Sequence, residues 1–400
     1  MLSRLAMLRW SCITPDRSIA VLLLVELLLF FWDFAYKLGL NHHTGYPVLA
    51  SCASVAVFAV SMAAWFMLAA TRGWRFQYRL RSLMLLVVAV AFPVSWLATE
   101  VRLARKRAET RCALEAMGGN CYYRETDLAA QVLNVRPSRS WAKRVLGEDF
   151  FEDVQIVILA NADAADDCLV NLPSLRFVRD LDLRGTRLTD ADLNHVKRLT
   201  ALEALDLSST GVTDAGLGKL ASLKRLRVLC LRNTRITDAG MWHARQFADL
   251  WQLQLCDDTL ITDAGLDNVG KLRLRVLRLD GTGVTDAGLE LLGKVPTIEE
   301  LGLSKTRVDG SGFSFLVRLA CLRTLDLSST KVSDTTVANL TAFAGLRELA
   351  LENTVVTDIG IEHLGKLRNL KVLYLRNARV TNTGIEKLHK ALPRCMIYFN

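Results

Sequence analysis

Apolar and polar positions repeat with a 24-residue period along residues 154–400 of this 400-residue chain. The unit at residues 202–223 reads LEALDLSSTGVTDAGLGKLASL, and its threonine returns in register along the chain. A period of this length, with its L-x-x-L-x-L pattern, predicts stacked units that share one core. The threonines stand at Thr186, Thr210, Thr234, Thr259, Thr282, Thr306, Thr330 and Thr354, with Ala378 in the ninth place.

Each unit predicts one short strand, one turn and one short helix. Leu205-Asp206-Leu207 alternates with period two, which predicts a strand with inward leucines. The threonine hydroxyl after it is expected to bond backbone groups at the turn, giving a ladder of hydroxyls. In the T-D-A-G run that follows, Thr213 or Asp214 is expected to cap a short helix. The fold class is therefore α/β, a solenoid with parallel strands on its concave face and short helices on its convex face.

Three apolar runs precede the repeats, at residues 18–36, 46–70 and 82–98. Each is near the length of a membrane-spanning helix, so residues 1–98 are predicted as a transmembrane region. Buried core helices are the alternative. A charged helix at 99–117 is expected to continue from the third span, and residues 118–153 are expected to cap the solenoid. Glu26 lies inside the first run, where it either contacts another subunit or is a tolerated neutral acid.

The charge of the chain is divided unevenly. The chain has 50 Lys+Arg and 41 Asp+Glu, a net charge of +9, and residues 1–111 hold 13 of those bases and 5 of those acids. The excess surrounds the apolar runs, which favours a multi-pass protein of the cell membrane over a nucleic-acid partner. The positive charges are almost balanced between the two sides. Because long domains cross membranes largely regardless of charge, the repeats are placed outside the cytoplasm.

Four features together resemble a known group, the membrane-anchored leucine-rich-repeat proteins common in planctomycete bacteria. They are S-L-x-L-L at 82–86 after an arginine, Gly118-Gly119 at the end of the charged helix, G-E-D-F-F at 147–151 and the T-D-A-G-L repeats. The repeats alone are similar to the ribonuclease-inhibitor-like or F-box type, although no F-box is present. The resemblance covers residues 72 onward and implies a curved solenoid that binds proteins. The first two apolar runs are not typical of the group.

Most residues that could take part in catalysis or metal binding occupy fixed positions of the repeat. Aspartates such as Asp214 and glycines such as Gly216 recur at fixed positions, so helix capping and tight packing explain them better than catalysis. His42-His43 alone is a poor metal site. We therefore expect no catalytic residue, metal or cofactor. Cys230 and Cys256 fall on neighbouring predicted strands, so either a bridge between them or two free thiols fits the sequence.

Residues that vary between the repeats are the better candidates for function. The positions beside the inward leucines are expected to point out of the concave face, where Tyr and Arg favour protein contacts. The spacing from Thr234 to Thr259 is one residue longer than the 24-residue period, and the next spacing is one residue shorter, which indicates an aspartate inserted at residues 256–258. A solvated surface and structural drift are the alternatives. The candidate partner-binding residues are Arg184, Arg232, Gln254, Asp257, Asp258, Arg278, Asp280, Tyr374 and Arg376.

The sequence thus predicts an integral membrane protein that displays a leucine-rich-repeat solenoid to an unknown protein ligand, without catalysis. The alternative is a structural protein that organises the cell envelope through self-association of its solenoid. An enzyme would need a cluster of titratable residues in the cap at 118–153.

Overall fold

The computed structural model describes residues 22, 25, 46–71, 80–123, 148–150, 152–161 and 169–399. These form two compact units, one of residues 1–112 with 123–154 and the other of residues 113–122 with 155–400. Most of the predicted span at 18–36, including Glu26, lies outside the described residues, as do His42-His43 and most of the predicted cap.

The first unit contains two long helices, α3 (Tyr46–Thr71) and α4 (Leu80–Ala116). Helix α4 runs without interruption through the predicted third span and the charged helix after it, although Pro93 lies inside it. In the described part of the chain, one stretch, Val87–Ala116, is long and apolar enough to cross a membrane, and α3 contributes a shorter apolar stretch at Val48–Val60.

Ion pairs and apolar contacts attach a short 3-10 helix, η1 (Glu148–Phe150), to the charged half of α4. Phe150 is buried against Ala104 of α4. Arg111 lies 3.2 Å from the Asp149 carboxylate, and Arg107 pairs with Asp153. Because both ion pairs are partly or fully buried, they fix the segment on the helix.

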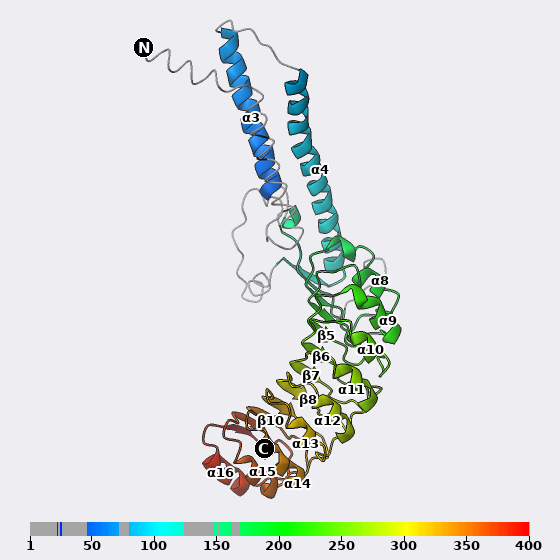
Figure 1. Cartoon of the computed structure of the whole chain (residues 1–400), viewed down its shortest axis with the longest axis vertical. Helices are drawn as coiled ribbons and strands as arrows, with labels where there is room; N and C mark the ends of the chain where they lie inside the picture. Colours follow the sequence, from blue (N-terminus) through cyan, green and yellow to red (C-terminus); the bar gives the residue numbers. More distant parts are fainter. Residues whose placement is uncertain are drawn as a thin grey trace, which may run out of the picture. The chain divides into compact units, whose positions relative to one another are not determined.

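The second unit is built on one 12-stranded sheet whose strands follow one another in chain order (Figure 1). Strand β1 (Asn120–Tyr122) pairs antiparallel with β2 (Ile156–Ile158), and all later pairs are parallel. The later strands are β3 (Asp180–Asp182), β4 (Ala204–Asp206), β5 (Val228–Cys230), β6 (Gln252–Gln254), β7 (Val276–Arg278), β8 (Glu300–Gly302), β9 (Thr324–Asp326), β10 (Glu348–Ala350), β11 (Val372–Tyr374) and β12 (Met396–Tyr398).

Short helices lie on the other side of the core from the strands (Figure 1). They are α8 (Leu193–Val196), α9 (Asp214–Lys219), α10 (Met241–Ala244), α11 (Asp263–Val269), α12 (Asp286–Leu292), α13 (Phe313–Leu316), α14 (Asp334–Val337), α15 (Asp358–Leu364) and α16 (Asn382–Ala391), with 3-10 turns η2 (Leu172–Ser174), η3 (Leu220–Ser222) and η4 (Ala338–Ala342). The predicted leucine-rich-repeat solenoid, with parallel strands and short helices, is confirmed.

Leucines of the strands and helices fill the space between these two layers. In the unit at 202–223, Leu207, Leu217 and Leu220 are 0% exposed. Each such side chain stabilises the fold by about 1.5 to 3 kcal/mol. A single unit would leave these leucines half uncovered, so the core forms only when neighbouring units stack.

The turn after each strand is the same in every repeat. Its second residue has a positive φ, as at Ser209 (56°) and Asn233 (52°). In the repeats where a threonine follows, it donates its hydroxyl hydrogen to the carbonyl oxygen of the leucine three residues earlier, as Thr210 does to Leu207 at 2.6 Å; Asp258 and Ala378 stand at this position in two repeats. Each hydroxyl therefore closes the turn of its own repeat. The predicted ladder of hydroxyls consists of the same turn repeated along the stack.

The recurring aspartate does something other than the predicted capping of its own helix. The threonine before it is the N-cap residue, as at Thr262 and Thr285. The Asp238 carboxylate instead accepts hydrogen bonds from the backbone nitrogen of Thr262 (2.8 Å) and from its hydroxyl (2.6 Å), one repeat further on. The aspartate thus links consecutive repeats. The same pair of bonds joins Asp190 to Thr213, Asp214 to Thr237, Asp263 to Thr285, Asp334 to Thr357 and Asp358 to Thr381.

The glycine of T-D-A-G makes room for this link. A Cβ added to Gly265 would lie 2.6 Å from Asp238 Oδ1, inside van der Waals contact. The predicted role of the glycines in tight packing therefore has a specific cause, because each one accommodates the carboxylate of the preceding repeat.

We expect Asp238→Ala to lower the free energy of unfolding by about 2 kcal/mol, since two hydrogen bonds to a carboxylate are lost. Gly265→Ala should cost roughly 1 to 3 kcal/mol by overpacking. In the double variant the missing carboxylate leaves space for the new methyl group. Its loss of unfolding free energy should therefore be smaller than the sum of the two single losses. Urea denaturation measures all three variants, with exposed Asp249→Ala as the control. Strict additivity would contradict the proposed steric coupling.

Candidate functional site

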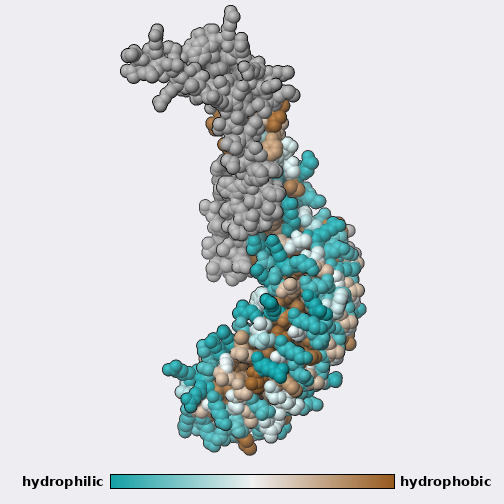
Figure 2. All heavy atoms as spheres, viewed as in Figure 1, coloured by the Kyte–Doolittle hydropathy of each residue, from teal (hydrophilic) through white to brown (hydrophobic). Residues whose placement is uncertain are grey.

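Three rows of side chains point outward from the sheet. They come from the first and third residues of each strand and from the residue two positions later, while the leucine between them is buried. Parallel pairing is in register, so Asp206 lies beside Cys230 and Cys230 beside Gln254. Figure 2 shows the visible face of the repeats covered mainly by hydrophilic residues, with apolar residues between them. The rows themselves contain carboxylates, arginines, amides and thiols, so they form a mixed polar surface.

At the N-terminal end of this surface, charged residues neutralise one another. Arg184 donates to the Asp182 carboxylate at 2.9 and 2.6 Å, and lies 4.0 Å from Asp206. Hydrogen bonding to Asp182 and its negative charge raise the pKa of Arg184. Arg232 pairs with Asp257 at 2.9 Å across neighbouring repeats. Both arginines are largely exposed, so each pair contributes at most about 1 kcal/mol.

Two free thiols lie in the middle of the surface. Burial raises the pKa of Cys230 and of Cys256 to about 12, so both thiols are protonated. Cys256 lies two residues beyond the position level with Cys230, which separates their Cα atoms by roughly 8 Å. That distance exceeds the reach of a disulfide. The bridge considered from the sequence is therefore wrong, and Cys256 instead contacts the Asp280 carboxylate at 3.4 Å.

The irregular repeat differs from its prediction in one respect. Positive φ recurs every 24 residues through Asn233, Asp257 and Gly281, so Asp257 occupies an ordinary turn position and Asp258 takes the place of the threonine. The extra residue therefore lies after Asp258, in Thr259-Leu260, and Leu260 is 55% exposed. The predicted insertion within residues 256–258 is wrong because matching threonine to threonine misaligned this turn.

Asp258 is a buried carboxyl group with an incomplete set of partners. Its side chain is 2% exposed, and Oδ1 accepts a hydrogen bond from the Thr234 backbone nitrogen at 2.6 Å. Oδ2 is buried without a hydrogen-bond partner. Burial raises the pKa of Asp258 to about 7, although the hydrogen bonds from Thr234 lower it in part. When protonated, the carboxyl group regains the O–H donor that the threonines of the other repeats supply.

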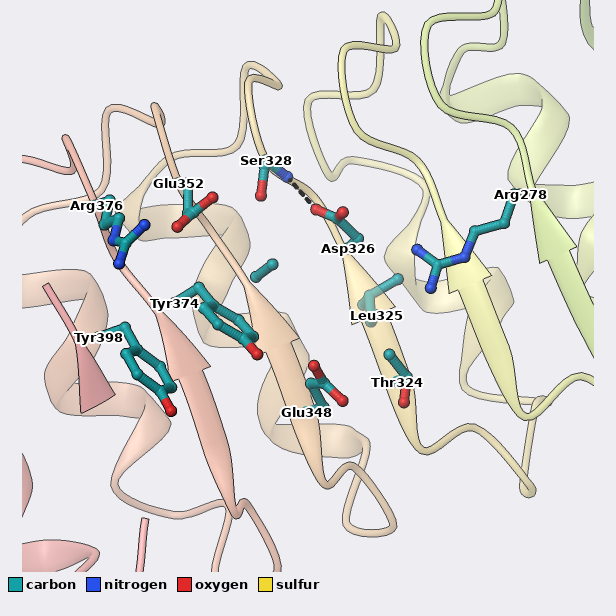
Figure 3. Close-up of a pocket in the computed structure, with 11 residues that line it drawn as sticks. Arg278, Thr324, Leu325, Asp326, Ser328, Glu348, Glu352, Tyr374, Arg376 and Tyr398 are labelled. Atoms are coloured by element: carbon teal, nitrogen blue, oxygen red, sulfur yellow. Dashed lines mark hydrogen bonds between the residues drawn. The ribbon is translucent and has the colours of Figure 1, made fainter. Parts of the chain in front are cut away.

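At the C-terminal end of the surface, outward side chains surround a hollow of about 380 Å³ on β9, β10 and β11 (Figure 3). Three predicted candidates, Arg278, Tyr374 and Arg376, line it. The other six, Arg184, Arg232, Gln254, Asp257, Asp258 and Asp280, do not line it. The structure thus divides the predicted set between a hollow and a flatter, self-neutralised part of the sheet face.

Further lining residues were not among the candidates. Glu348 is the first residue of β10, and period-two alternation places it on the same side as Ala350. Tyr398 lies 24 residues after Tyr374, on a strand beyond the last unit that the threonine count identified. Both could have been found by extending the strand pattern by one residue and by one unit. Among the described residues, no group of three His, Cys, Asp or Glu residues is placed to hold a metal ion.

The repeats have the leucine-rich-repeat fold, with one strand and one short helix per unit. A family model described as Leucine Rich repeat matches residues 199–221. A leucine-rich-repeat protein of Leptospira interrogans is 22% identical with a TM-score of 0.43, covering 57% of this chain and 62% of that one. Internalin C2 of Listeria monocytogenes is 21% identical with a TM-score of 0.40, covering 53% and 84% of the two chains. No curated protein sequence matches the chain. The chain spans under two thirds of the Leptospira protein.

We expect Asp258→Thr to raise the free energy of unfolding by about 1 to 3 kcal/mol at pH 8, because an ionised carboxylate with an unpartnered oxygen is removed from the core. The pKa of Asp258 is raised on folding from 3.8 to about 7, so the ionisation penalty begins above about pH 4, grows until about pH 7 and is constant above it. The advantage of the variant should therefore shrink at pH 5. Urea denaturation at pH 5 and pH 8 tests this, with Asp249→Thr as control. An equal advantage at both pH values would contradict it.

Proposed function

We propose that this chain is an integral membrane protein whose leucine-rich-repeat solenoid binds a protein ligand on its concave sheet face, without catalysis. The observation that carries the proposal is the contrast between constant and variable positions. Leucine, threonine, aspartate and glycine positions make the fold in repeat after repeat, whereas the outward rows change from strand to strand. A sheet face of this kind offers one continuous surface on which arginine and tyrosine side chains can serve as contact points.

The membrane part of the proposal is a multi-pass anchor, whose spans are the three apolar runs at about 18–36, 46–70 and 82–98. Its support in the structure comes from α4, where Val87 is 61% exposed, Val88 55% and Val94 57%. Apolar side chains of this size on a long helix are stable when lipid covers them. The repeats are placed on the far side of the membrane from the cytoplasm.

A second function, self-association of the solenoid, is favoured by strand β12. In the described part of the chain β12 pairs with β11 alone, and Met396 is 58% exposed and Tyr398 41%. An edge strand with exposed apolar side chains can pair with a strand of another molecule. A second copy of the chain would then be the partner.

Photo-crosslinking from single positions separates the two functions. A photoreactive amino acid replacing exposed Arg232 or Arg376 should crosslink one defined heterologous protein. The same group at Ile359, which is 68% exposed on α15, should not. Adducts that contain this chain alone would favour self-association. Equal yields from both faces would contradict a concave binding surface.

The side of the membrane is tested by Cys321, which is exposed on the repeats. A membrane-impermeant maleimide added to intact cells should label the chain, and Cys321→Ser should remove that part of the label. Labelling of Cys321 only after the cells are permeabilised would place the repeats in the cytoplasm instead.

A further inference from the structure

The hollow at the C-terminal end of the sheet exists because a short side chain stands between longer ones. Ala350 lies between Asp326 on β9 and Tyr374 on β11 in the register of the sheet. Ala350 lines the hollow, and the longer side chains of Asp326 and Tyr374 line it on either side (Figure 3). One outward position of the concave face is therefore recessed and lies between an aromatic ring and a carboxylate.

The aromatic wall presents a ring face to the recess. Tyr374 and Tyr398 stack with ring centroids 5.1 Å apart and an interplanar angle of 11°. Because neighbouring strands are about 4.8 Å apart, the rings stack along the direction from strand to strand. The second face of Tyr374 is therefore turned toward the gap above Ala350. A tyrosine ring face attracts cations through its quadrupole.

Three carboxylates surround the rest of the recess. Glu348 and Glu352 occupy the outward positions before and after Ala350 along its chain segment, and Asp326 lies on the neighbouring strand. Asp326 Oδ1 accepts a hydrogen bond from the Ser328 backbone nitrogen at 2.9 Å. Within the described residues, no Lys, Arg or His forms an ion pair with any of the three carboxylates. The recess thus combines partly shielded negative charge with an aromatic face.

The two arginines that line the hollow do not neutralise its centre. Arg278 lies across β8, where Gly302 leaves it space, since a Cβ there would be 2.6 Å from Arg278 Cδ. Its guanidinium is 3.9 Å from the Glu300 carboxylate on β8, and it lines the hollow from that side. Arg376 is exposed two residues beyond Tyr374. Arg376 also lies level with Glu352 on the neighbouring chain segment. The hollow therefore holds two positive side chains against three carboxylates, and its net charge is negative.

We propose that the recess over Ala350 binds one positively charged side chain, an arginine or a lysine, carried by an extended segment of the protein ligand. This inference rests on the proposed function of the concave face. The methylene stem of the side chain lies along the Tyr374 ring, and its cationic head is attracted by the carboxylates of Asp326, Glu348 and Glu352 around the recess. A neutral or acidic side chain would leave these carboxylates unpaired, so the recess selects the partner by charge.

The test uses the full chain in detergent and four blocked peptides of glycine and serine around one central residue. That residue is arginine, lysine, its neutral analogue citrulline, or glutamate. Ligand-observed NMR should show saturable binding of the arginine and lysine peptides. The citrulline and glutamate peptides should bind at least roughly tenfold more weakly, and added salt should weaken the cationic peptides.

Variants of the recess give the matched controls. Glu348→Gln with Glu352→Gln should weaken the arginine peptide roughly tenfold or more. Tyr374→Leu should weaken it and Tyr374→Phe should not, because phenylalanine keeps the ring face. Asp182→Asn with Asp206→Asn, on the same sheet face at its other end, should leave it unchanged. Equal binding of the citrulline and arginine peptides, or an equal loss in the distant pair, would overturn the proposal.

A second variant needs no peptide. Ala350→Lys places an ammonium group beside the carboxylates within the chain itself, so it should unfold at a higher temperature than Ala350→Gln, and high salt should remove the difference. A lysine variant no more stable than the glutamine variant would count against a cation site.

If the peptides bind but the concave face crosslinks no protein, the proposed function fails and the recess stands. If a protein is crosslinked equally well by the Glu348→Gln, Glu352→Gln variant, the recess fails and the proposed function stands.

Discussion

The solenoid depends on a hydrogen-bonded link between consecutive repeats, from an aspartate to the threonine one repeat further on. Hydrophobic burial alone favours stacking but tolerates sliding, because leucines of similar shape fit one another at several offsets. The Asp238 carboxylate meets both the backbone nitrogen and the hydroxyl of Thr262, so it fixes the offset between the two units. Gly265 admits the carboxylate at 2.6 Å from the place where a Cβ would lie. The aspartate of one repeat and the threonine and glycine of the next therefore form one contact that links the two repeats.

This contact explains which parts of the structure could be read from the sequence. The strands, the turns and the inner leucines follow from local alternation, as at Leu205-Asp206-Leu207, and nine copies in register reinforce the pattern. The role of the aspartates did not follow, because the partner of Asp238 is 24 residues away. Within its own unit the same residue resembles an ordinary capping group. Contacts between units are invisible to an interpretation made one unit at a time.

The same limit applies to the candidate site. Arg278, Tyr374 and Arg376 were found because side-chain type marks contact residues. The recess itself was not found, since it depends on the short side chain of Ala350 between Asp326 and Tyr374 on neighbouring strands. The spacing of the threonines predicts an insertion at Asp258, and only the turn geometry shows that this residue replaces a threonine in the core. A sequence predicts which residues lie on a sheet face more readily than it predicts where that face is hollowed.

Uniform stacking also determines how such a protein can acquire specificity. Each repeat places its outward residues about 4.8 Å from those of the next repeat, so a change at one position alters only its immediate neighbours on the face. At the N-terminal end this produces pairs such as Arg184 with Asp182, which leave little charge for a ligand. At the C-terminal end, Gly302 and Ala350 shorten two positions in the same row. The first lets Arg278 turn toward Glu300, and the second opens the recess beside Tyr374. Two small residues, with the backbone unchanged, thus turn a flat and neutral surface into one with a charged recess.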